Sequence, residues 1–226
     1  MPAPTSNDSL QKIFGHLPSE GLAAVAALFS PRTVERNQPV LRQGDTWDTA
    51  SIIHRGLVRM AFTRRDGREF NKSFHFDGML VCPITEAMIR QPSLFSIHTV
   101  EPCLLLQAPA ARLRECLSDF QAWEPLRTQL LERLVTHKLE REYHLLVMDG
   151  RTRYAHFCAS APQLAGRVPL AQLATYLGMT DVALSRIRRN SRPDSSGKSV
   201  LPVVRGLCVC SRSTGCCKMI FPLLKL

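Results

Sequence analysis

The sequence predicts an α+β fold in which an antiparallel β-roll precedes a long helix and a C-terminal helix-turn-helix. Three features support this order. Short apolar segments separated by turn residues occupy the first half of the chain, a stretch poor in glycine and proline follows over 110–149, and two apolar-periodic segments joined by a glycine occupy 170–189. The chain has 226 residues with 45% hydrophobic content, which suffices for one large or two small domains.

Short strands are predicted from about Leu17 to Gln107. Turns containing Gly44, Gly56, Gly67 and Gly78 separate them at short intervals. This spacing is typical of an antiparallel sandwich or roll. The predicted strands are PVLRQGD, ASIIHRG, LVRMAFTRRDG, REFNKSFHFDG, SIHTVEP and CLLLQAP.

A long helix is predicted from Ala110 to Asp149, where Pro125 is the only proline and glycine does not occur. One side of this segment carries too many polar residues for a helix that is buried on all sides. A stripe of mostly apolar residues repeats at steps of three, four and seven. Such steps match the contact line of a coiled coil, so we expect this stripe to form a homodimer interface. The stripe comprises Trp123, Leu130, Leu134, His137, His144 and Met148.

His137 and His144 lie seven residues apart on this stripe. Polar residues at such positions most often set the register of two helices. A pH-sensing or metal-bridging pair is the alternative.

The segment LAQLATYLGMTDVALSRIRR predicts two short helices joined by a tight turn. Leu170, Leu173, Ala174 and Leu177 give the first helix its apolar face, and Gly178 ends it. Thr180 is a suitable N-cap for the second helix, with Asp181 in its first turn. The arrangement is that of a helix-turn-helix.

The charge distribution supports nucleic acid as a partner. Residues 1–150 hold 17 Lys and Arg against 17 Asp and Glu, whereas residues 151–226 hold 12 against two, Asp181 and Asp194. A cluster of cations at one end of a neutral protein releases counterions when it binds a polyanion. A solvated basic tail without function is the alternative, and the helix-turn-helix in the same segment favours nucleic acid.

The cysteines fall into two groups. Four are scattered among apolar residues and are predicted to be reduced core residues. The other four cluster in CVCSRSTGCC, where the spacings C-x-C and C-C, without a nearby histidine, are not those of a zinc site. We therefore expect neither a metal site nor a cofactor. The groups are Cys82, Cys103, Cys116 and Cys158, and Cys208, Cys210, Cys216 and Cys217.

No uncharged run reaches the roughly 20 apolar residues that a membrane span needs. The first ten residues, MPAPTSNDSL, lack the basic and apolar regions of a signal peptide. We expect a cytoplasmic protein with no membrane partner.

Over residues 15–190 the chain resembles the Crp/Fnr family of bacterial transcription regulators. The resemblance implies a cyclic-nucleotide-binding-like sensory domain at 15–117, a dimerisation helix at 118–150 and a helix-turn-helix domain at 151–190. Residues 191–226 depart from the family and have no clear periodicity, so we expect an atypical, disordered tail or an altered reading frame. The motifs that carry the resemblance are QPVLRQGD, IIHRGLVRM, RRDGRE, FHFDG and, most specifically, RVPLAQLATYLGMTDVALSRIRR.

The resemblance implies a non-enzymatic homodimer that binds double-stranded DNA, with each recognition helix in a major groove of a roughly palindromic operator. A small-molecule effector and RNA polymerase are the further partners that it implies. One alternative is an effector-binding module with degenerate DNA contacts that acts through protein partners. Another is a cupin-like enzyme on the same roll, which the absence of His-x-His spacing disfavours.

The resemblance places Ser185 and Arg186 where family members contact bases. Arginine suits guanine because its two donors match O6 and N7. Many family members have glutamate where this chain has Val182, which can contact only a thymine methyl. Arg188 and Arg189 are then expected to contact phosphates. The predicted DNA-binding residues are Thr180, Asp181, Val182, Ser185, Arg186, Arg188 and Arg189.

The effector is not predicted to be cyclic AMP. Members that bind it have an arginine where this chain has Phe95-Ser96-Ile97, and a buried phosphate needs a paired cation. Arg90 is the nearest arginine that could substitute. No cysteine precedes Cys82, so the ligands of iron-sulfur members are missing. The remaining histidines of this region, His54, His75 and His98, are interpreted as surface or core residues.

Overall fold

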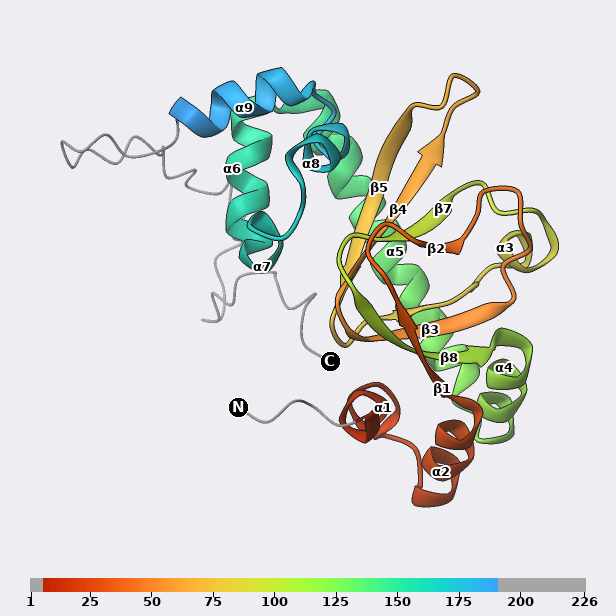
Figure 1. The fold of residues 1–226 in the computed structure, drawn as a ribbon. Coiled ribbons are helices and arrows are strands. Elements are labelled where there is room, and N and C mark those ends of the chain that lie inside the picture. The colour runs from red at the N-terminus through yellow and green to blue at the C-terminus, as the bar shows by residue number, and fades with distance from the viewer. Residues whose placement is uncertain (1–5, 191–226) are drawn as a thin grey trace, which may run out of the picture.

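The computed structural model describes residues 6–190 (Figure 1). Two four-stranded antiparallel sheets form a β-roll, with strand orders β1-β8-β3-β6 and β2-β7-β4-β5. The predicted α+β roll with flanking helices is confirmed. The strands are β1 (Ser30–Val34), β2 (Pro39–Leu41), β3 (Thr49–Arg55), β4 (Leu57–Thr63), β5 (Glu69–Phe76), β6 (Leu80–Val81), β7 (Ser96–Thr99) and β8 (Cys103–Pro109).

The predicted strands and the observed ones differ at the start of the roll. The segment after Leu17 is a helix, α2 (Ser19–Leu28), because its alanines and leucines favour helix. This helix packs against α4 (Ala110–Asp119). Strands β1 and β6 were not predicted. In β1 only Val34 is buried, and β6 has two residues, so neither carries a clear alternating pattern.

The hairpin of β4 and β5 pairs Leu57 with Phe76 at its base and Thr63 with Glu69 near its tip. Successive side chains of a strand point to opposite faces. The pairing with β4 shifts between Met60 and Ala61, so Lys72 is an extra residue between Ser73 and Asn71 and the alternation is interrupted there. Asn71 is 3% exposed, and Lys72 is half-buried.

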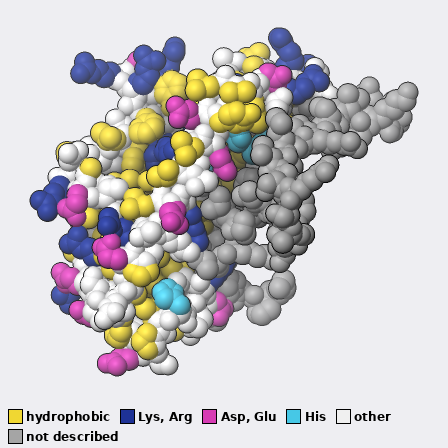
Figure 2. All heavy atoms as spheres, turned by 180° about the vertical axis from the view of Figure 1, so that it is seen from behind, with side chains coloured by type: hydrophobic (Ala, Val, Ile, Leu, Met, Phe, Trp, Pro, Cys, Tyr) yellow, Lys and Arg dark blue, Asp and Glu magenta, His cyan; other side chains and the backbone are white. Residues whose placement is uncertain are grey.

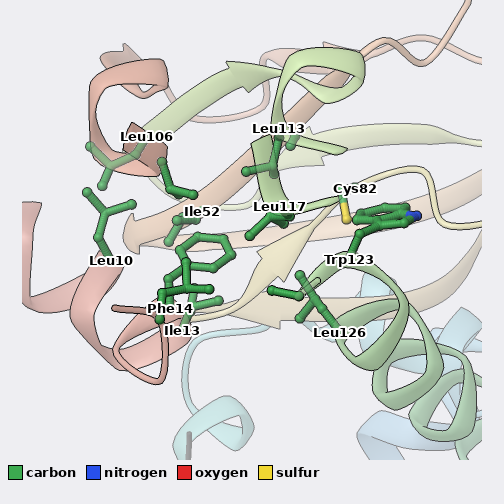
Figure 3. Packing of buried hydrophobic residues seen from close by; sticks show 14 of the residues in the cluster. Leu10, Ile13, Phe14, Ile52, Cys82, Leu106, Leu113, Leu117, Trp123 and Leu126 are labelled. Carbon is green, nitrogen blue, oxygen red and sulfur yellow. The ribbon is translucent and has the colours of Figure 1, made fainter. Parts of the chain in front are cut away.

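The lower part of the roll is closed by helices. α1 (Ser6–Phe14), α2 and α4 lie together at this end (Figure 1). Their apolar side chains meet the roll and the start of α5 (Trp123–Val147) in one buried cluster (Figure 3). Members of this cluster include Leu10, Ile13, Phe14, Ile52, Cys82, Leu106, Leu113, Leu117, Trp123 and Leu126.

The segment 110–149, predicted as one long helix, forms two. α4 ends at Asp119, and Gln121, which follows it, adopts a left-handed backbone conformation with a φ of 55°. The turn lets Leu117 of α4 and Trp123 of α5 reach the same cluster. The long helix that follows is therefore restricted to α5.

The C-terminal helices form a compact group at one end of α5 (Figure 1). They are α6 (Gly150–Ser160), α7 (Pro162–Ala165), α8 (Leu170–Tyr176) and α9 (Asp181–Asn190). Their core, which includes Phe157, Leu173 and Leu184, also contains Leu57 and Phe74 of the roll. The group is thus packed against the roll of its own chain.

Two of the four body cysteines are buried as predicted, and two are half-buried. Burial raises the pKa of Cys82 to about 12 and that of Cys103 to about 11, so both thiols stay protonated at neutral pH. Cys116 and Cys158 are partly exposed. The cluster formed by Cys208, Cys210, Cys216 and Cys217, and the whole segment 191–226, lie outside the described residues. Between residues 6 and 190 the helices are too short or too polar to cross a membrane.

Candidate functional site

The helix-turn-helix consists of α8 and α9, as predicted from their apolar spacing. Gly178 has a φ of 66°, the left-handed conformation that favours glycine, and it turns the chain between the two helices. The hydroxyl of Thr180 accepts a hydrogen bond from the amide of Ala183 at 3.2 Å, so Thr180 is the N-cap of α9.

Helix α9 buries only Leu184 and presents most other side chains to solvent. Val182, Arg186 and Arg189 recur at steps of four and three and share one exposed face. Arg188 is also exposed, and it lies close enough to Tyr154 of α6 to influence the pKa of that hydroxyl. Burial raises the pKa of that tyrosine, and the Arg188 interaction acts in the opposite direction. The predicted residues Thr180, Asp181 and Ser185 are exposed on the same helix end.

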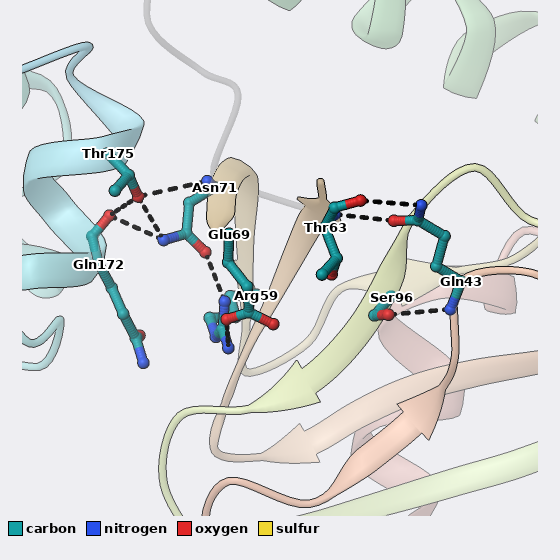
Figure 4. Close-up of polar contacts among 8 residues, drawn as sticks. All are labelled: Gln43, Arg59, Thr63, Glu69, Asn71, Ser96, Gln172 and Thr175. Atoms are coloured by element: carbon teal, nitrogen blue, oxygen red, sulfur yellow. Dashed lines mark hydrogen bonds and ion pairs between the residues drawn. The ribbon is translucent and has the colours of Figure 1, made fainter. Parts of the chain in front are cut away.

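Asn71 of β5 holds α8 against the roll (Figure 4). Its amide nitrogen donates to the carbonyl oxygen of Gln172 at 2.9 Å and to the hydroxyl of Thr175 at 2.8 Å. Its side-chain oxygen accepts from Arg59 at 3.1 Å, and Arg59 also forms an ion pair with Glu69. We call this set the Asn71 contact.

Two arginines add to the junction between the roll and the C-terminal helices. Arg141 of α5 donates to the main-chain oxygens of Tyr176 and Asn71, and its guanidinium lies 4.5 Å from the centre of the Tyr176 ring. Arg167 forms ion pairs with Asp77 at 3.0 Å and with Glu101. These contacts fix the helix-turn-helix relative to the roll.

The residues predicted to form the dimer interface face the interior of their own chain. Trp123 is 8% exposed, and Leu130 and Leu134 pack against the same buried cluster. His137 is half-buried, and the ring of His144 lies 4.2 Å from that of His156 on α6. Leu130 and Leu134 therefore already have apolar neighbours within a single chain.

The outer face of α5 carries a different apolar stripe. Val135, Leu139, Tyr143 and Leu146 are 54%, 62%, 50% and 78% exposed. They follow one another at steps of four, four and three, so they lie on one side of the helix. We call them the outer stripe. Hydrophobic side chains are exposed across the view from behind, with cations grouped near its upper corners (Figure 2).

A cavity of about 370 Å³ lies between the roll, the inner face of α5 and the C-terminal helices. Trp47, Phe95, Leu80 and Leu130 are among its apolar residues. The cavity is therefore bounded by all three parts of the chain. The polar residues in its wall include Lys72, His75, His137, Lys138 and Arg141.

Burial lowers the pKa of the basic groups in this wall. The pKa of Lys72 falls to about 8, and those of His137 and His75 fall to about 4 and about 3, in each case mainly because burial disfavours the charged form. Neighbouring cations, Lys138 and Arg141 among them, lower these values further. Both histidines are accordingly neutral at pH 7.

The residues that line this cavity, its cations included, were not predicted from the sequence. Phe95, Ser96 and Ile97, where the phosphate-binding arginine is absent, are all buried. Arg90 is exposed and pairs with Glu86 at 2.9 Å, and it does not line the cavity. Lys72 was overlooked because a lysine in an alternating strand is usually directed to solvent.

The other histidines of the roll lie in different environments. His54 is buried, and its Nδ1 lies 2.9 Å from the hydroxyl of Ser9. His98 is half-buried on β7. These two are core or partly exposed residues, as interpreted from the sequence, whereas His75 lines the cavity.

Residues 31–120 match the family model of the cyclic nucleotide-binding domain. A search of curated protein sequences gives no match.

Solved structures with the same fold include transcription regulators of the Crp/Fnr family. FixK2 from Bradyrhizobium japonicum has a TM-score of 0.63 at 15% identity, over 72% of this chain and 83% of that one. The c-di-GMP-responsive global regulator CLP of Xanthomonas campestris has a TM-score of 0.63 at 16% identity, over 76% and 91%. A CooA mutant from Carboxydothermus hydrogenoformans has a TM-score of 0.60 at 17% identity, over 74% and 77%. The predicted resemblance in fold is confirmed.

Proposed function

We propose that this chain is a transcription regulator that binds DNA sequence-specifically as a homodimer and is controlled by an effector held in the cavity. The observation that carries the proposal is the exposed face of α9, where Val182, Arg186 and Arg189 lie together beside a capped N-terminus. An exposed, basic recognition helix is the element that enters a major groove. The regulator folds of FixK2 and CLP support the same class of function.

Arg186 is proposed to bind a base and Arg189 a phosphate. Replacing Arg186 by alanine should weaken binding to the selected operator by about 1–3 kcal/mol and reduce discrimination at one base pair of each half-site. Arg189→Ala should weaken binding to all DNA sequences alike. It should also lower the magnitude of the slope of the logarithm of affinity against the logarithm of salt concentration by about one. DNA selected from a random pool with the wild-type protein supplies the operator, and fluorescence anisotropy at two salt concentrations measures both variants.

Arg90→Ala is the matched control, because Arg90 is an exposed arginine on the roll. Equal and sequence-independent losses for Arg186→Ala and Arg189→Ala would contradict base reading. They would favour the alternative of an effector module that acts through protein partners.

The dimer is proposed to form through the outer stripe. Apolar residues on one exposed face at helical steps are the surface that a second α5 helix can cover. Replacing Leu139 and Leu146 together by glutamate should release monomers in analytical ultracentrifugation. Leu130→Glu should instead unfold the protein, because Leu130 packs against the buried cluster. A dimer that survives both changes in the outer stripe would contradict this interface.

Cyclic AMP is not proposed as the effector, since the buried segment Phe95, Ser96 and Ile97 has no arginine at the position where family members that bind cyclic AMP have one. Saturating cyclic AMP should therefore leave the melting temperature unchanged, whereas a ligand at about 100 times its Kd adds about 2.7 kcal/mol of stability.

A further inference from the structure

Lys72 carries a charge that the described part of the protein does not neutralise. Its ammonium nitrogen lies 4.5 Å from the centre of the Phe95 ring and 3.7 Å from the sulfur of Met60. Within residues 6–190 it forms no ion pair. An ammonium has three donors, and withdrawing it from water without a carboxylate or carbonyl partner costs free energy.

Two cations of α5 lie on the same side of the cavity. Lys138 lowers the pKa of Lys72, and Arg141 lowers that of Lys138, so the three charges act on one another. Arg141 donates to main-chain oxygens, which are neutral acceptors. Like charges in partly buried positions repel one another, and an anion among them would remove the repulsion.

The carboxylates in the cavity wall do not neutralise these three cations. Asp77 is engaged by Arg167 and by the amide of Gly56. Glu140 forms no ion pair with any of residues 6–190. Lys72, Lys138 and Arg141 therefore form no ion pair with a carboxylate of this part of the chain.

Two buried ring nitrogens point to the same conclusion. Nδ1 of His75 and Nε2 of His137 are buried and have no hydrogen-bond partner among the described residues. His75 uses its other nitrogen in a contact of 3.0 Å with Ser73. Buried polar atoms are normally paired, so unpaired ones beside a cavity indicate positions that a ligand can fill.

The remaining wall of the cavity is apolar, with Trp47, Leu80, Ile84 and Leu126 among its residues. A small inorganic anion would leave this surface uncovered, and a neutral apolar ligand would leave the cations unpaired. We propose that the cavity binds an organic anion, with its charged group between Lys72 and Arg141 and its apolar body against this wall. The inference rests on the proposed function, for which it names the chemistry of the effector.

Arg141 gives such a ligand a route to the helix-turn-helix. The same guanidinium that lines the cavity holds the carbonyl of Tyr176 at the end of α8. An anion that binds Arg141 competes with this carbonyl and changes how α8 is held. Ligand binding and DNA binding are then coupled through one side chain.

The test compares two probes on the full chain by isothermal titration calorimetry. 8-Anilinonaphthalene-1-sulfonate is an apolar body with one anionic group, and N-phenyl-1-naphthylamine is its neutral counterpart. The wild type should bind the sulfonate at least about tenfold more tightly, which is the usual effect of a charge-assisted hydrogen bond. Lys72→Met should abolish that preference, and Lys72→Arg should restore it.

Arg90→Gln, at an exposed arginine of the roll that does not line the cavity, is the control for adventitious binding and should leave both affinities unchanged. Arg141→Gln is the second variant and should also weaken the sulfonate. Equal affinities for the two probes, or an unchanged preference in Lys72→Met, would overturn the anion site. Neither measurement contains DNA, so loss of operator binding by Arg186→Ala can fail or succeed independently of it.

Discussion

Asn71 and Lys72 stand side by side on β5, yet the polar contacts on their two sides differ in kind. The side-chain amide of Asn71 is fully paired, because it donates twice and accepts once. The pairing in the cavity is incomplete, because among residues 6–190 the ammonium of Lys72 meets an aromatic ring and a sulfur atom but forms no ion pair. Buried polar groups stabilise a structure when they are paired and cost free energy when they are not. The first region therefore connects the roll to the C-terminal helices, and the second is where we propose that a ligand binds.

The largest effect is expected at Asn71. Asn71→Ala should lower the free energy of unfolding by about 2–4 kcal/mol, because it removes three hydrogen bonds of a buried side chain, those with Arg59, Gln172 and Thr175. Urea denaturation at pH 7 measures it. Thr128→Ala, at an exposed position of α5, is the control and should change the value by less than about 0.5 kcal/mol. A similarly small effect at Asn71 would show that the contact does not stabilise the junction.

At Lys72, a substitution should change the free energy of unfolding in the opposite direction. Lys72→Met should raise the free energy of unfolding at pH 7 by about 2–3 kcal/mol, because the fold lowers the pKa of Lys72 to about 8 and so disfavours its charged form. Between the folded pKa and the ordinary lysine value, only the unfolded wild type binds the proton. Wild-type stability therefore rises with pH across this window, and the advantage of the variant should shrink there.

Urea denaturation of both proteins from pH 7 to 10 checks this sign. A variant less stable than the wild type at pH 7 would mean that Lys72 is a structural residue, and the contrast with Asn71 would fail.

A smaller effect is expected on the acid side. The pKa of His137 is lowered to about 4, so below the ordinary histidine value only the unfolded state gains this proton. Stability is complete above about pH 6.5 and is lost as the pH falls toward 4. His137→Leu should remove about 1–2 kcal/mol of the loss between pH 7 and pH 5. His16→Leu, at an exposed position, should keep the wild-type profile.

The pH profile is measured by urea denaturation at each pH. If His137→Leu and the wild type lose equal stability between pH 7 and pH 5, the ring of His137 is not held neutral in the cavity wall.

Local sequence signals predicted the hairpins and the helix-turn-helix because neighbouring residues decide them. Gly178 takes a left-handed conformation, Thr180 caps α9, and Leu184 is buried at the expected helical position. The order of the parts along the chain was likewise sufficient for the fold class. Strands β1 and β6 escaped prediction because their pairing with β8 and β3 comes from distant segments.

The sequence by itself determined that α5 is a long amphipathic helix, but not which face meets which partner. Periodicity shows that Leu130 and Leu134 share a side, and it shows the same for Leu139 and Leu146. Only the tertiary structure turns the first pair toward the roll and leaves the second exposed. It also brings Lys72 of β5 and Arg141 of α5 to one cavity. The physical reason is that burial and charge pairing depend on long-range contacts, which a local pattern cannot contain.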